Sequence, residues 1–114
     1  MKLKDIVEKV DLQVFHAGES WEQETGLGYV GDLLSDVIAS GRKDMLWITI
    51  QVHENIVAVA SLKDLAGIIL AKGNQPHDDT LTAARAENIT LLGSRLNAYQ
   101  LIEKLIGLGV SGNA

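Results

Sequence analysis

The 114-residue chain contains no cysteine, which excludes disulfides, thiolate chemistry and cysteine-ligated zinc or iron–sulfur clusters. Aromatic residues make up only 4% of the chain and leave few side chains for stacking on bases. The net charge is −5, and no long run of lysine and arginine is present. Because nucleic-acid binding needs clustered positive charge, we expect no nucleic acid as a partner.

Long apolar runs are also missing. No stretch approaches the roughly 18 apolar residues of a membrane span, so we expect no membrane partner. Charged residues interrupt the segment MKLKDIVEKV where a signal peptide would be apolar. Together with the missing cysteine, this predicts a cytoplasmic location. Apolar residues still make up 46% of the chain, which is enough for the core of one domain.

Apolar spacing predicts helices over residues 3–10, 32–41, 77–88 and 97–109. The first of these places Leu3, Ile6, Val7 and Val10 on one face. Asp32 and Asn97 are the expected N-caps of the second and fourth helices, and Gly41 is the expected stop of the second.

Short segments rich in aliphatic and β-branched residues predict strands over residues 12–17, 27–31, 45–52, 67–70 and 89–94. The strand at 45–52 lacks polar alternation, so it is expected to be buried with Trp47 in the core. Trp21 lies in a polar loop at 18–26, where it either covers the edge of the core or forms part of a partner surface. Residues 111–114 read as a flexible tail.

The segment from residue 53 to 64 is ambiguous. Its valines allow a second hairpin arm beside the strand at 45–52, but the intervening HEN lacks the glycine of a tight turn. Its alanines and the following SLKDL favour a helix, which we place from Asn55 to Asp64.

The strand–helix order from Met45 onward predicts the fold class. We expect a single compact α/β domain over residues 1–110, with a mainly parallel sheet of about five strands and helices packed on it. In such sheets, ligands bind beyond the carboxyl ends of the strands. The segments 51–55, 71–76 and 93–97 should meet at that edge, and 31–35 is expected to join them.

The segment AKGNQP at 71–76 is the most specific of these. Gly73 and Asn74 suit a left-handed turn, and Pro76 suits the first turn of the helix that follows. Free N–H groups at that helix start could hold an anion, but Asp78 and Asp79 already complement the helix dipole. Ligand contact and simple turn chemistry therefore both remain open for this loop.

The polar residues at the expected edge are the candidate ligand-binding residues: Asp32, Gln51, His53, Lys72, Gly73, Asn74, Gln75 and Ser94. His53 ends a buried strand, where it either contacts a ligand or caps the next helix. The three histidines lack the spacing of metal ligands, and no serine lies in a nucleophile motif. We therefore expect no enzyme, no metal and no cofactor.

Three stretches carry a resemblance to a known family: GYVGDLLSDVIA (28–39), LWITIQVHENIVAVASLKDLAGIILAKGNQP (46–76) and ITLLGSRLNAYQLIEKL (89–105). They resemble the stand-alone form of the DRTGG domain. The TGG of the family name corresponds to Ala71-Lys72-Gly73, so one glycine is kept, and the DR pair has no clean match near residues 51–55.

The resemblance implies a fold like the N-terminal domain of HPr kinase/phosphorylase, without the kinase's phosphate-binding loop. It also implies a non-catalytic regulatory or accessory domain that senses a nucleotide or another small ligand. Such a domain would act through a larger, redox- or hydrogenase-associated enzyme. The alternative is a pure protein–protein interaction module with no ligand. In either case we expect a homodimer, because a sheet of this size leaves an edge to cover.

Overall fold

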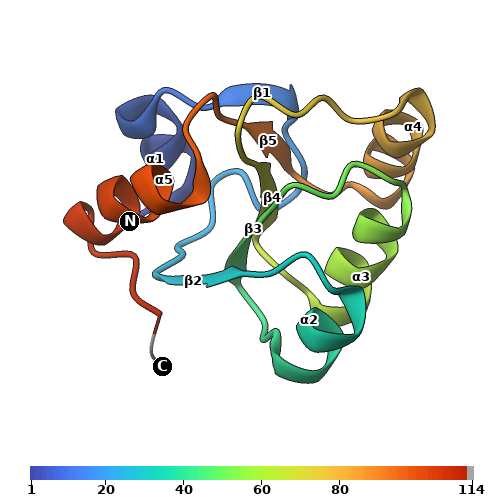
Figure 1. Cartoon of the computed structure of the whole chain (residues 1–114), viewed down its shortest axis with the longest axis horizontal. Coiled ribbons are helices and arrows are strands. Elements are labelled where there is room, and N and C mark those ends of the chain that lie inside the picture. Colours follow the sequence, from blue (N-terminus) through green and yellow to red (C-terminus); the bar gives the residue numbers. More distant parts are fainter. Residues whose placement is uncertain (113–114) are drawn as a thin grey trace.

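The computed structural model describes residues 1–112 and shows five helices and five strands (Figure 1). The helices are α1 (Leu3–Val10), α2 (Leu34–Ser40), α3 (Asn55–Lys63), α4 (Asp78–Glu87) and α5 (Ala98–Gly107). The strands are β1 (Gln13–His16), β2 (Leu27–Val30), β3 (Met45–Thr49), β4 (Gly67–Leu70) and β5 (Leu91–Gly93).

The strands form one sheet in the order β1-β5-β4-β3-β2. From β2 to β5 the neighbours are parallel, whereas β1 runs antiparallel to β5. The expected α/β class and mainly parallel sheet are confirmed. The helix at 55–63 is confirmed as well, so the hairpin alternative for this segment is wrong.

Helices cover both faces of the sheet (Figure 1). Helices α1 and α5 lie on one face, and α2, α3 and α4 lie on the other. The side chains of the buried strands alternate between the two layers because successive residues point to opposite faces. In β3, Leu46 and Ile48 join the core beneath α1 and α5, whereas Met45 and Trp47 join the core beneath α2 to α4.

Both tryptophans pack in or against a core of the domain. Trp47 is fully buried, and its Nε1 donates to the backbone oxygen of Gly31 at 2.8 Å. Trp21 packs, partly buried, against the core beneath α1 and α5. Trp21 therefore covers the core edge.

The helix ends confirm one predicted cap and correct two other expectations. Asn97 caps α5, and its side chain and that of Gln100 accept each other's backbone N–H groups. Asp32 is not an N-cap: α2 begins at Leu34, and the Asp32 carboxylate turns to the end of β3 instead. Pro76 precedes α4 rather than lying in its first turn, because that helix begins at Asp78.

The segment after α5 returns to the free edge of β2. Val110 is buried, and the N–H and C=O groups of Ser111 bond to Gly26 and Gly28 of the β2 side, each at 2.8 Å. The chain is thus held against the sheet at Ser111, within the segment predicted as a flexible tail. Residues 113 and 114 of that tail lie outside the described residues.

Candidate functional site: a cationic cleft at the ends of β4 and β5

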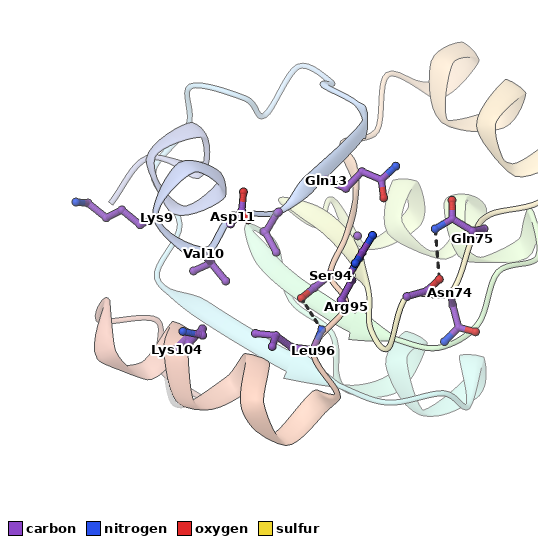
Figure 2. A pocket seen from close by; sticks show the side chains of 13 residues that line it. Lys9, Val10, Asp11, Gln13, Asn74, Gln75, Ser94, Arg95, Leu96 and Lys104 are labelled. Carbon is purple, nitrogen blue, oxygen red and sulfur yellow. Dashed lines mark hydrogen bonds between the residues drawn. The ribbon is translucent and has the colours of Figure 1, made fainter.

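A cleft of about 840 Å³ opens beyond the carboxyl ends of β4 and β5 (Figure 2). Its walls come from the end of α1, the start of β1, the loops after β4 and β5, and α5. The residues that line it are Lys9, Val10, Asp11, Leu12, Gln13, Gly73, Asn74, Gln75, Gly93, Ser94, Arg95, Leu96 and Lys104. Its size and its place at the strand ends are those of a small-molecule site.

The loop after β4 is held in place by backbone bonds to the loop after β5. The N–H of Lys72 donates to Leu96 O at 2.7 Å, and that of Gly73 donates to Ser94 O at 2.8 Å. Lys72 and Gly73 adopt positive φ angles of 61° and 70°. Asn74 does not have a positive φ. We expected Gly73 and Asn74 to be the left-handed residues of this turn, but they are Lys72 and Gly73. The N–H of Asn74 also bonds within the turn, to Ala71 O.

These bonds decide how the loop could bind a ligand. The N–H groups of residues 72, 73 and 74 all have protein acceptors and are not free to hold an anion. The backbone of residues 72 to 74 therefore offers no anion site, whereas the anion expected at the start of the next helix concerns the N–H groups at the start of α4 and stays a prediction. Gly73, Asn74 and Gln75 do line the cleft, so the loop contributes side chains and shape.

The cleft is positively charged in an acidic protein. Three cationic side chains line it, Lys9 from α1, Arg95 from the loop after β5 and Lys104 from α5, against the single carboxylate of Asp11. None of these cations forms a salt bridge within residues 1–112. The lining thus carries a net charge of +2, although the chain as a whole carries −5. The field in the cleft favours an anion.

Ser94 is the most buried polar side chain of the lining, with 9% of its surface exposed. Its Oγ accepts the N–H of Leu96 at 3.1 Å, which leaves the hydroxyl proton free to donate. Asn74 Nδ2 donates to Ala71 O at 2.8 Å and Gln75 Nε2 to Gly73 O at 3.3 Å. Both amide oxygens therefore remain available as acceptors.

The predicted candidates separate into two groups. Gly73, Asn74, Gln75 and Ser94 lie together in the cleft. Lys72 lies in the same turn but does not line the cleft.

Asp32, Gln51 and His53 lie outside the cleft, along the ends of β2 and β3. The side-chain amide of Gln51 donates to the backbone oxygen of Asp32 at 3.0 Å. The Nδ1 of His53 accepts the N–H of Asn55, the first residue of α3, at 3.1 Å. Its ring meets that of His77 edge-on, with 6.1 Å between the ring centroids.

No group of three or more histidines and carboxylates in the described part of the chain could hold a metal ion. No helix within residues 1–112 is long and apolar enough to span a membrane.

Sequence reasoning missed the cationic residues of the cleft. Lys9 lies on the exposed side of α1, and Lys104 lies on the exposed side of α5. Such positions are normally solvated surface charges, and no local pattern marks them. Arg95 was within reach of prediction, because it lies in the segment 93–97 that was expected at the ligand edge.

Comparison with known proteins shows the fold. No family model and no curated protein matches the chain. Among solved structures, the chain is similar to the CBS and DRTGG domains of the regulatory region of a Clostridium perfringens pyrophosphatase, complexed with its activator diadenosine tetraphosphate. The TM-score is 0.68 at 12% sequence identity, and the match covers 92% of this chain.

The chain spans 46% of that structure, or about half of its length. At this identity the likeness establishes a related fold and nothing more specific. The matched region is a regulatory one in the pyrophosphatase.

Proposed function

We propose that this chain is a non-catalytic regulatory domain of the DRTGG type, which binds a nucleotide or another small ligand in the cationic cleft and acts through a partner enzyme. The observation that carries the proposal is the cleft itself. It is of small-molecule size, it lies where parallel α/β sheets bind ligands, and it gathers a buried hydroxyl and three cations that form no salt bridge with any described residue.

The similar fold in a regulatory region supports the regulatory part of the proposal. The donor set supports its non-catalytic part. Ser94 has no neighbouring base among the cleft residues, and Asp11 is the only carboxylate of the lining. The lining is therefore suited to binding an anion through charge and hydrogen bonds.

A thermal-shift screen of the full chain tests ligand binding. The panel contains adenine and guanine nucleotides, dinucleotides and acyl phosphates. A ligand at about 100 times its dissociation constant adds about 2.7 kcal/mol to the free energy of unfolding. A rise in melting temperature that is lost in a Gly73→Ala/Asn74→Ala double variant supports the proposal. A flat screen with folded protein contradicts its ligand-binding part.

A second candidate is a dimerisation or protein-interaction module without a ligand. It is favoured by an apolar groove of about 200 Å³ between β2 and α5. Val30 and Ile106 line this groove and are 46% and 61% exposed. Exposed apolar side chains such as these suit contact with a second copy, whereas the edge of β2 itself is partly covered by Ser111.

Light scattering separates the two candidates. The interaction module predicts a dimer at tens of micromolar that an Ile106→Glu change converts to a monomer while α5 stays folded. A monomer in the unchanged protein removes the homodimer from both readings. Retention of a partner enzyme by the ligand-free protein, lost with the same change, favours the interaction module.

A further inference from the structure

We infer that the ligand of the cleft is a nucleotide with a chain of phosphates, whose phosphates lie along Arg95, Ser94 and Lys104 and whose base faces Asn74 and Gln75. This inference rests on the proposed function and names the ligand class of that site. It follows from the way the cleft distributes its charge and its hydrogen-bonding groups.

The cleft has a charged end and a neutral end (Figure 2). Lys9 and Lys104 lie at one end, on α1 and α5, and Arg95 lies with Ser94 in the middle. Asn74 and Gln75 lie at the opposite end, on the loop after β4. A ligand that fills the cleft therefore needs several negative charges at one end and a polar, uncharged group at the other.

Phosphates suit the charged end. The guanidinium of Arg95 offers a fork of donors that matches phosphate oxygens, and Lys104 acts as a point charge beyond it, whereas the Lys9 side chain points outward (Figure 2). The free hydroxyl proton of the buried Ser94 supplies a donor on the floor of the cleft. Asp11 stands at this end as the one opposing charge, so it should weaken the binding of an anion.

The source of the positive charge has a measurable consequence. The backbone N–H groups of residues 72 to 74 are already bonded to protein oxygens. Anion binding in this cleft must then depend on exposed side-chain charges, which salt screens much more strongly than buried dipoles. Affinity should fall steeply as the salt concentration rises.

The neutral end suits a base that carries an amino group. The side-chain nitrogens of Asn74 and Gln75 donate to the backbone of their own loop, so their oxygens are left as acceptors. An exocyclic amino group, such as that of adenine, donates hydrogen bonds and suits an end of the cleft that offers acceptors. A base with a carbonyl in place of the amino group, such as hypoxanthine, would turn an acceptor oxygen toward the amide oxygens of Asn74 and Gln75, and no hydrogen bond could form.

Titration calorimetry on the full chain tests these assignments with ATP, ITP, adenosine and tripolyphosphate. We expect ATP to bind more tightly than each of the other three. We also expect ATP affinity to fall by tenfold or more between about 0.05 M and about 0.2 M salt.

Matched variants place the phosphates. Arg95→Gln and Lys104→Gln should each weaken ATP binding about tenfold while leaving adenosine binding unchanged. Arg85→Gln on α4 and Lys43→Gln before β3 remove the same charges outside the cleft and should have no effect. Asp11→Asn should tighten ATP binding, and asparagine suits the positive φ of 56° at this position.

The outcomes distinguish this inference from the proposed function. Equal binding of adenosine and ATP, with no effect of Arg95→Gln, overturns the phosphate assignment and leaves a ligand-binding domain. ATP and ITP binding equally overturns the base assignment alone. No binding of any probe to folded protein overturns the inference and the nucleotide reading of the proposed function together.

Discussion

The carboxylate of Asp32 is hydrogen-bonded to the hydroxyl of Thr49, with 2.8 Å between Asp32 Oδ1 and Thr49 Oγ1. The same oxygen accepts the N–H of Ile50 at 2.9 Å. Asp32 thus ties the loop after β2 to the end of β3, where Thr49 is buried. This contact explains why Asp32, which the sequence suggested as an N-cap, does not cap α2; its predicted ligand contact stays a prediction.

Replacement of Asp32 by alanine should therefore destabilise the fold without changing ligand affinity. The change removes two hydrogen bonds to a charged group at an exposed position, so we expect a loss of about 1–2 kcal/mol in the free energy of unfolding. Urea unfolding measures the loss. Glu103→Ala, an exposed carboxylate on α5, is the matched control. Weaker ATP binding by a still-folded Asp32→Ala protein would show that Asp32 belongs to the ligand site after all.

Two glycines should respond oppositely to alanine. A Cβ on Gly18 would collide with the backbone oxygen of Asn88 and approach the nitrogen of Thr90 to 2.7 Å, whereas a Cβ on Gly107 in α5 meets nothing within 4 Å. Gly18→Ala should cost about 1–3 kcal/mol, because backbone atoms cannot easily yield. Gly107→Ala should stabilise the protein by about 0.5 kcal/mol through helix propensity. Thermal unfolding of the two variants and the original protein measures these changes. A Gly18→Ala variant as stable as the Gly107→Ala variant would contradict the close approach at Gly18.

A buried polar network closes the opposite end of the sheet. The hydroxyl of Thr90 accepts the N–H of Gly18 at 2.9 Å and lies 2.8 Å from the hydroxyl of Ser20, which itself bonds to Ala66 O. Thr90→Val should cost about 2–3 kcal/mol, because it leaves the Gly18 N–H buried without an acceptor.

Ser20→Ala should cost less than Thr90→Val, since it leaves that bond intact. Chemical denaturation of the two single variants and the double variant measures the coupling between them. Thr82→Val, on the exposed side of α4, controls for the change of residue type and should stay within about 0.5 kcal/mol of the original protein. Additive losses at Ser20 and Thr90 would show that the two hydroxyls act independently.

The pKa of Tyr29 is raised above its ordinary value, chiefly because its hydroxyl donates to Asp36 Oδ2 at 2.6 Å. The neutral phenol is the form that this bond favours. Its stabilising contribution is complete below the unfolded pKa of about 10 and is lost as the pH rises through the higher folded value. We therefore expect stability to decline above pH 10 in part through Tyr29.

Tyrosinate absorbance followed against pH checks this expectation. The late-titrating component should disappear in Tyr29→Phe. It should move to lower pH in Asp36→Asn, where the carboxylate acceptor is gone. An unchanged titration curve in the Asp36 variant would mean that the bond does not control the ionisation of Tyr29.

The secondary structure of this protein was largely readable from its sequence. The apolar faces of α1 and α5, the buried run of β3 and the Asn97 cap are local signals, because each depends on residues a few positions apart. One error, at Asp32, occurred where a distant partner competed with a local role, whereas the errors at Pro76 and Asn74 concern the local course of one loop. Asp32 is a residue type that often serves as an N-cap, but its carboxylate accepts hydrogen bonds from Thr49 and Ile50.

By itself, the sequence determined the α/β class, the parallel βαβ order and the meeting of the loops at 71–76 and 93–97, because periodicity and strand direction are properties of the chain. Only the tertiary structure decided which charges face those loops. Antiparallel pairing of β1 with β5 brings Asp11 and Gln13 to the cleft, and the packing of α1 and α5 on one face brings Lys9 and Lys104 there. Exposed lysines carry no periodic signal of their own, so their convergence is visible only after the helices have packed.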